Sequence, residues 1–199
     1  VLYSESAYGF PSIQDKQPRI MDTQTALVLL DGERIGLDET KARDYYRILD
    51  LQKGFSERGY TYLTKNGKEA KLVFRRLASF VTKNILCYEI SVEYNGDIEI
   101  VSVLEADVSN HADANDPRVA SGHKKLLETQ QLFVKDNLAF CKVKTLTTEI
   151  PLLCGVEYKA ASYHADAVTM AHHVIDQSIF STVKAKGQLV LQKKCIFVD

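Results

Sequence analysis

The stretch ILCYEISVEYNGDIEIVSVLEAD, residues 85–107, carries the clearest structural pattern in the chain. In its first ten residues apolar and polar side chains alternate, which is the period of a β-strand with one buried face. Asn95-Gly96 then interrupts the alternation, and both residue types tolerate the positive φ angles of tight hairpin turns. The stretch therefore predicts two antiparallel strands joined at Asn95-Gly96, with the face that bears Tyr88 and Ile90 in the core.

Turn and strand signals continue on both sides of this stretch. Asp31-Gly32 and Asn66-Gly67 predict further hairpins, and Lys186-Gly187 predicts the last turn of the chain. The intervening segments rich in β-branched and aromatic residues are 25–30, 59–64, 69–79, 138–148, 154–161, 181–185 and 188–198. We therefore expect a mainly β protein, an antiparallel β-sandwich with at most one or two short helices.

Two segments leave the choice between helix and strand open. In residues 38–51, apolar positions lie at helical spacing behind Asp38, a possible helix N-cap. Residues 165–175 also allow a helical turn, through Ala167, Met170 and Val174.

Composition and charge exclude several classes of partner. The 199 residues are enough to bury a sizeable single core. The 25 basic and 26 acidic residues are mixed along the chain, so no basic stripe is available to neutralise a nucleic-acid backbone. The longest apolar runs are far shorter than the roughly 20 residues that span a bilayer. We expect neither nucleic acid nor a membrane as a partner.

The start of the chain differs from the rest. Residues 1–23 contain Gly9, Pro11 and Pro18 and show no periodicity, so they predict an extended lead-in at the truncated edge of a longer chain, followed by a β domain over 24–199. Because this start has neither an initiator Met nor a signal pattern, the compartment stays open, with a slight preference for the cytoplasm.

One long polar loop, residues 109–125, is the place where a site is expected, because loops on rigid sheets commonly carry function. Its candidate residues are His111, Asp113, Asp116, Arg118 and His123. His111, Asp113 and Asp116 could supply metal ligands, but a loop that contacts a neighbouring domain or the rim of its substrate pocket is the simpler interpretation. We therefore expect no metal here.

Other potentially reactive residues have ordinary explanations. The four cysteines lack metal-ligand spacing and predict reduced, structural thiols. His172 and His173 are neighbours, and neighbours in a strand point to opposite faces, which disfavours a shared metal. The acidic residues of the 85–107 stretch predict solvated strand faces; they include Glu89, Glu93, Glu99 and Glu105. Sequence motifs for serine hydrolases, nucleotide sites and zinc proteases are absent.

Four segments in a fixed order resemble the N-terminal β-sandwich domain of glycoside hydrolase family 65. They are LDLQKG at 49–54, KLVFRRLAS at 71–79, the paired strands within 85–107, and ADVSN at 106–110. The resemblance covers roughly residues 24–199 and implies a sandwich of the supersandwich type. It also implies an extended conformation for residues 45–51.

The resemblance further implies that the catalytic acid lies outside this chain, in a C-terminal (α/α)6 barrel that is absent from it. No catalytic residue is expected here, and no cofactor. The whole enzyme is expected to cleave an α-linked glucose disaccharide, such as maltose, trehalose or kojibiose, with inversion. Attack by inorganic phosphate, as co-substrate, or by water stays open. The domain is expected to pack on its own barrel and to help form a homodimer.

Two other functions compete with this one. An independent carbohydrate-binding sandwich needs a row of exposed Tyr or Phe on one sheet face. The chain has no Trp and ten Tyr, but the pattern places Tyr60, Tyr62, Tyr88 and Tyr94 in the core. A metal-dependent module would have to use the His- and Asp-containing loop.

Overall fold

The structure is a computed structural model that describes residues 19–36, 42–109, 115, 125–163 and 168–199. These residues form eleven strands and no helix. The strands are β1 (Ala26–Leu30), β2 (Glu33–Ile35), β3 (Ala42–Asp50), β4 (Phe55–Leu63), β5 (Glu69–Ala78), β6 (Ile85–Glu105), β7 (Leu127–Lys135), β8 (Leu138–Thr145), β9 (Pro151–Ala161), β10 (Thr169–Ile175) and β11 (Ser178–Val198). The described part of the chain offers no helix that could cross a membrane.

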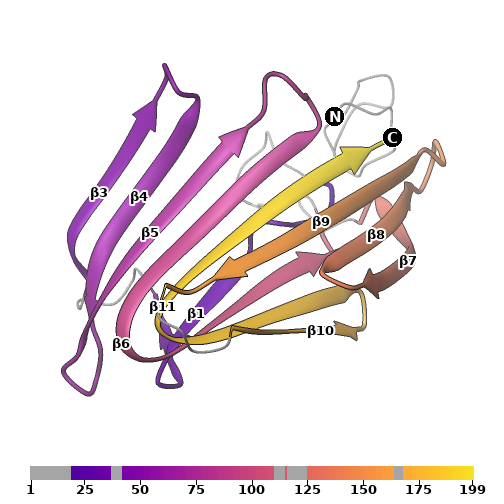
Figure 1. Ribbon diagram of the computed structural model, residues 1–199. Coiled ribbons are helices and arrows are strands. Elements are labelled where there is room, and N and C mark those ends of the chain that lie inside the picture. The colour runs from indigo at the N-terminus through magenta and orange to yellow at the C-terminus, as the bar shows by residue number, and fades with distance from the viewer. Residues whose placement is uncertain (1–18, 37–41, 110–114, 116–124, 164–167) are drawn as a thin grey trace.

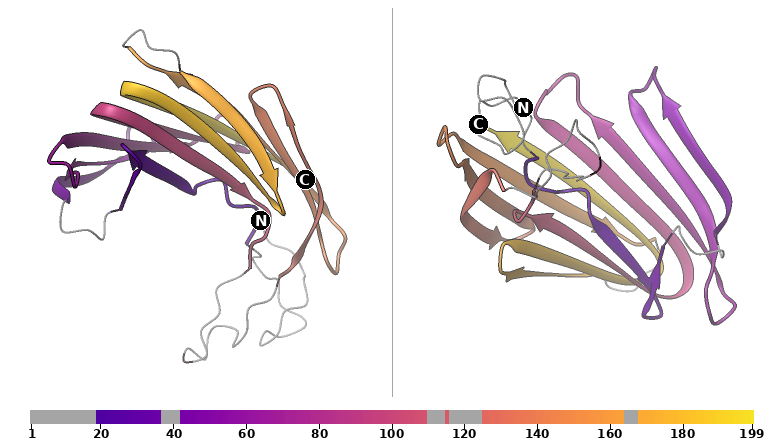
Figure 2. Two further views of the ribbon diagram at one scale, coloured as in Figure 1. Left: turned by 90° about the horizontal axis from the view of Figure 1, so that it is seen from below. Right: turned by 180° about the vertical axis from the view of Figure 1, so that it is seen from behind.

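All strands pair antiparallel in one sheet of order β3-β4-β5-β6-β11-β9-β8-β7 (Figure 1). The centre of the sheet is the ladder between β6 and β11, each 21 residues long. Half of this ladder is flanked by β5 and β9, and the other half by β1 and β10. Two layers therefore share the same two long strands, and the sheet curves strongly (Figure 2).

The two layers enclose one core. Tyr158 of β9 reaches the other half of the sheet, where its hydroxyl lies 3.4 Å from that of Ser102 and its ring lies 5.5 Å from the ring of His172. Fully buried residues come from both layers, among them Leu30, Tyr62, Leu72, Ile98, Ile100, Leu104, Leu189 and Leu191. The predicted mainly β, antiparallel fold is confirmed, as are Tyr60, Tyr62 and Tyr94 in the core, while Tyr88 is only partly buried.

The predicted hairpins at Asn95-Gly96 and Lys186-Gly187 are wrong, because β6 and β11 run through both positions. In the ladder Lys186 pairs with Asp97, but Gly187 pairs with Tyr94, so Asn95 and Gly96 form a bulge in β6. Gly187 takes up a positive φ of 77° directly opposite. The residues that permit a turn also permit a bulge, and only the long partner strand decides between them.

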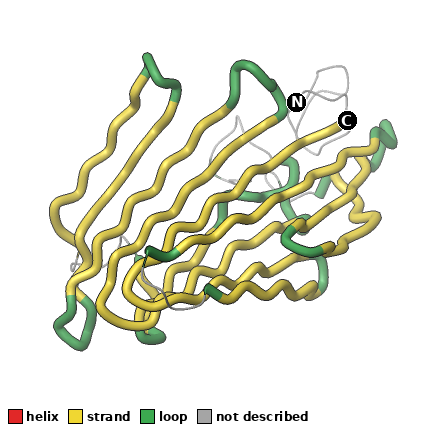
Figure 3. The backbone as a smooth tube through the Cα atoms, in the orientation of Figure 1, coloured by secondary structure: helices red, strands yellow, loops and turns green. Residues whose placement is uncertain are grey.

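The other turn predictions are confirmed. Asp31-Gly32 joins β1 to β2 with φ angles of 48° and 81°, and Gly67, with a φ of 78°, lies in the turn between β4 and β5 (Figure 3).

Both ambiguous segments are strands. Residues 42–50 form β3, as the family resemblance implied, so a helix there is wrong. The possible helical turn in residues 165–175 is also wrong, because 169–175 pair throughout with β11 as β10, and the described residues include no helical turn. Helical spacing of apolar residues in a short segment is a weak signal, which pairing with a neighbouring strand overrides.

Asp31 ties the bulge to two turns. Its carboxylate accepts hydrogen bonds from Tyr94 Oη at 2.6 Å and Asp97 N at 2.9 Å in β6. It also accepts bonds from Asn66 Nδ2 and Lys68 Nζ in the β4–β5 turn, both at 3.0 Å. These donors, led by the Tyr94 hydroxyl, hold the pKa of Asp31 well below its usual range.

Gly96 is the residue that this arrangement leaves without room for a side chain. A Cβ at Gly96 would lie 2.5 Å from the Tyr94 ring and 2.6 Å from Asp31 Oδ1. We therefore expect Gly96→Ala to destabilise the chain by about 1–3 kcal/mol, the usual cost of overpacking. Gly36→Ala is the matched control, because nothing lies within 4 Å of a Cβ at Gly36. Urea unfolding of both variants is the measurement, and equal midpoints would refute the account of the bulge.

Candidate functional site

The loop expected to carry the site lies almost wholly outside the described residues, and His111, Asp113, Asp116, Arg118 and His123 are all among those not described. The structure does describe the two stems of the loop. Asp107 and Lys125 form an ion pair that brings the stems together. Glu105, two residues before the first stem, exchanges two backbone hydrogen bonds of 2.9 Å with Asp22. The loop therefore leaves the sheet beside the lead-in segment.

The two neighbouring histidines do not form a shared site. His172 faces the core, where its Nδ1 lies 2.8 Å from the Ser181 hydroxyl, and burial, followed by the neighbouring His173, lowers its pKa. His173 is exposed on the other face. Among the residues that the structure describes, no three His, Cys, Asp or Glu side chains are grouped to hold a metal ion.

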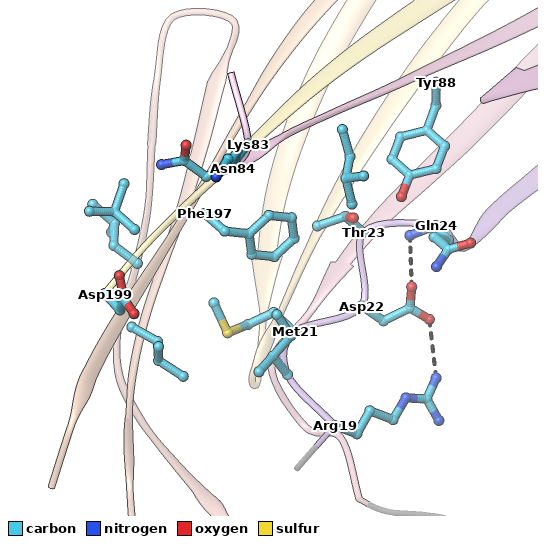
Figure 4. A pocket seen from close by; sticks show the side chains of 15 residues that line it. Arg19, Met21, Asp22, Thr23, Gln24, Lys83, Asn84, Tyr88, Phe197 and Asp199 are labelled. Carbon is cyan, nitrogen blue, oxygen red and sulfur yellow. Dashed lines mark hydrogen bonds and ion pairs between the residues drawn. The ribbon is translucent and has the colours of Figure 1, made fainter. Parts of the chain in front are cut away.

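A pocket of about 540 Å³ opens where the lead-in segment crosses the end of the sheet (Figure 4). Residues 19–24 form one wall, the turn between β5 and β6 forms another, and the end of β11 forms a third. Its apolar lining includes Met21, Leu86, Leu152 and Phe197. At its rim Arg19 pairs with Asp22 at 3.5 Å, and Asp22 also accepts a 2.7 Å bond from the Gln24 backbone N–H. The Asp22 carboxylate is therefore committed to local structure.

Behind this pocket lies a buried lysine. Lys193 of β11 is 2% exposed, its ammonium group donates to the Thr23 carbonyl, and it lies 5.5 Å from the centre of the Tyr88 ring. Burial lowers its pKa to about 8. Lys193 thus holds the lead-in segment against the sheet. The sequence does carry a signal for this buried lysine, because the alternation of Leu189, Leu191 and Cys195 places Lys193 at an inward position.

A second hollow, of about 450 Å³, lies across β5, β6 and β11 on the outer face of the sheet, which is the face that points away from the core. Here Arg75 donates from Nε to Glu57, at 2.5 Å, and from Nη1 to Glu89, at 2.9 Å. Gln192 Nε2 donates to Glu89 at 2.9 Å. Arg75, and after it the Tyr46 hydroxyl, lower the pKa of Glu57. These carboxylates are ion-paired acceptors, which fits a solvated strand face better than a pair of catalytic acids.

Exposed aromatic side chains do not form a platform for a sugar ring. Within the described ranges those more than a third exposed are Tyr45, Tyr46, Phe80, Phe133 and Tyr163, and they lie on β3, on the β5–β6 turn, on β7 and beyond β9. This scatter gives no support to an independent carbohydrate-binding sandwich, which needs a row of such rings on one face.

Comparison with known proteins decides the family. The model of the glycosyl hydrolase family 65 N-terminal domain matches residues 2–198 of the chain. The chain belongs to this family as its N-terminal domain. It is 37% identical over 159 residues to the alpha,alpha-trehalose phosphorylase of Geobacillus stearothermophilus, which covers 77% of this chain and 21% of that protein.

Other relatives agree with this assignment. The chain is 27% identical over 131 residues to the kojibiose phosphorylase of Halothermothrix orenii, which covers 64% of this chain and 16% of that protein. Its fold matches that of a putative kojibiose phosphorylase from human microbiome with a TM-score of 0.76 at 18% identity, over 100% of this chain and 25% of that one. The family 65 domain thus spans about a fifth of the length of the curated relatives it matches.

The buried Lys193 makes the stability of the family 65 domain depend on pH. Its pKa is about 8 in the folded chain against 10.5 for an ordinary lysine, so the unfolded chain binds the proton more tightly. The cost of burying the charge, about 3 kcal/mol, is fully present below pH 8 and is relieved as the pH rises towards 10.5.

We therefore expect the wild type to gain stability relative to Lys193→Met between pH 8 and pH 10, measured by urea unfolding at several pH values. Lys194→Met is the matched control, because Lys194 is the exposed neighbour on the outer face. A difference between wild type and Lys193→Met that stays constant with pH would contradict the assignment of a buried ammonium group.

Proposed function

We propose that this chain is the non-catalytic N-terminal domain of an enzyme that cleaves an α-linked glucose disaccharide with inversion, and that phosphate is the attacking group. The catalytic barrel lies outside the chain in this proposal. The observation that carries it is the 37% identity to an alpha,alpha-trehalose phosphorylase over 77% of the chain. α,α-Trehalose is accordingly the first substrate to test, and kojibiose the second.

The chemistry of the described residues supports the non-catalytic part of the proposal. An inverting reaction needs an acid on one side of the glycosidic bond and an attacking phosphate or water on the other. Three of the four acidic residues that line the two pockets are already paired: Asp22 with Arg19 and backbone N–H groups, Glu89 with Arg75, and Glu157 with Lys159. The fourth is Asp199. No cofactor is part of the proposal, because phosphorolysis consumes only disaccharide and phosphate.

Exposed apolar side chains at one end of the strands support packing on a further domain. At this end lie the β3–β4 turn, the β5–β6 turn, the β8–β9 turn and the end of β11 (Figure 1). The most exposed large apolar side chains there are Leu51, Phe80 and Val81, at 84%, 88% and 97%. Apolar exposure of this kind is typical of surfaces that another domain covers.

Two finer parts of the proposal concern contacts of the domain. The loop with His111, Asp113, Asp116, Arg118 and His123 is proposed to contact the rim of the substrate pocket, because its stems lie beside the lead-in segment. The second part of the proposal is that the whole enzyme forms a homodimer.

The direct test uses the complete enzyme that contains this chain. We expect it to release β-glucose 1-phosphate from α,α-trehalose only when phosphate is present, because inversion converts the α-linkage into a β-phosphate. Proton NMR of the first product gives the anomer. Cellobiose, with its β-linkage, is the control substrate and should not react. Cleavage at the same rate without phosphate would make the enzyme a hydrolase, and turnover by the 199-residue chain alone would overturn the non-catalytic role.

A further inference from the structure

Three arginines gather on one face of the strands β3, β4 and β5. Arg47 of β3 is the direct register partner of Arg58 of β4, and Arg58 is in turn the partner of Phe74 in β5. Arg76 lies two residues beyond Phe74 on the same face. We call this face, which also carries the buried Tyr60, the inner face, and the three side chains the arginine cluster.

The arginine cluster contains an uncompensated pair of like charges. Side chains of direct register partners in an antiparallel pair lie about 5 Å apart at Cβ, and like charges there are destabilising. The inner-face positions of β4 to β6 around the cluster carry no carboxylate; they are Ser56, Tyr60, Leu72, Leu86, Tyr88 and Ile90. Among the described residues, none of the three arginines forms an ion pair, and Arg76 donates only to Gln24 Oε1, at 3.0 Å.

The outer face of the same strands shows the opposite arrangement. There Arg75 lies between Glu57 and Glu89, and its guanidinium contacts both carboxylates. The arginine on the outer face of β4, β5 and β6 thus has carboxylate partners, whereas the arginines on the inner face have none among the described residues. Such a local violation is expected where another group supplies the missing charge.

Arg58 adds an independent sign of a missing partner. Its Nε is shielded from solvent and has no hydrogen-bond acceptor among the described residues. Its guanidinium lies 4.7 Å from the centre of the Phe74 ring, which fixes the fork of donors in place. A shielded donor without an acceptor costs free energy, and such groups in folded proteins are usually satisfied by a partner.

We propose that the arginine cluster binds carboxylates on the surface of the catalytic part of the same enzyme. This inference rests on the proposed function, since it takes that part to belong to the same polypeptide. It extends the surface that the catalytic part covers from the strand ends around Leu51, Phe80 and Val81 to the inner face of β3 to β5. It also names acidic side chains as what recognises this inner face.

The kind of surface favours a protein partner over a free anion. Arg47 and Arg76 are exposed, and Leu49, on the same face, is 67% exposed, so the cluster lies on an open, partly apolar surface. Arginine together with exposed apolar side chains is the composition of protein interfaces, and its planar fork matches carboxylates.

Pairing of a second copy of the domain along the β3 edge is disfavoured. The β3 edge is interrupted at Asp44, which has a positive φ of 54°, and the register shifts between Arg43 and Tyr46. Irregular edges of this kind oppose pairing with another strand. The relatives extend well beyond this domain, which covers 21% of the first of them, so in an enzyme of that length the remaining part would offer most of the available surface.

Zero-length cross-linking of the complete enzyme tests the proposal. A carbodiimide joins lysine to a carboxylate in contact with it but leaves arginine unmodified, so Arg47→Lys and Arg76→Lys each introduce one reactive amine while keeping the charge. We expect each variant to gain a cross-linked peptide that joins residue 47 or 76 to an Asp or Glu of the catalytic part. The wild type should lack these peptides, and mass spectrometry identifies them.

Lys71, an exposed lysine on the outer face of β5, is the matched internal control and should not join to the catalytic part. Enzyme labelled with nitrogen-15 and mixed with unlabelled enzyme separates links within one chain from links between copies. The proposal would be overturned by links between copies, by links that form only at sites where added phosphate prevents them, or by the absence of any link. An active phosphorylase without these links would leave the proposed function intact and refute the docking face alone.

Discussion

The pairing of β6 with β11 is the constraint on which the rest of the domain depends. Each strand is 21 residues long and passes through both layers, so the layers cannot be separate sheets that happen to stack. The bulge at Asn95-Gly96 and the positive φ of Gly187 bend both strands at the same point. Asp31 then fixes the bend by binding β6 and the β4–β5 turn at once. A bend of this kind needs long-range pairing to form, because neither strand specifies it alone.

This dependence explains how much of the fold the sequence could predict. Alternation identified most strands, and Asp31-Gly32 and Asn66-Gly67 identified true hairpins, since these features are local. Asn95-Gly96 and Lys186-Gly187 have the same local chemistry but face each other across a ladder formed by residues about ninety positions apart, and a turn and a bulge differ only in that partner. The helical spacing in residues 165–175 failed for the same reason, because β11 supplies the pairing.

The candidate sites also differ in whether the local sequence or the pairing of distant strands defines them. The sequence drew attention to a loop rich in His and Asp, which lies outside the described residues, while Lys193 and the arginine cluster went unnoticed. Each of these is defined by which face a side chain occupies and what stands across from it. Lys193 is exceptional only because it lies inward, and Arg47 and Arg58 only because register makes them partners. Family resemblance, by contrast, depends on segment order and could be read from the sequence directly.

The two faces of β4, β5 and β6 differ in the partners of their arginines, and the proposed docking of the inner face rests on that difference. On the outer face, Arg75 pairs with both Glu57 and Glu89, an arrangement that is common on surfaces that meet water. On the inner face, beyond the edge of the core, the described residues place no carboxylate beside the arginines. Arg58 Nε is shielded from solvent there and has no acceptor among these residues. Net charge near zero, −1 over the whole chain, hides this asymmetry. In the proposed docking on the catalytic part, this inner face would place unmatched positive charge where the carboxylates of that part meet it.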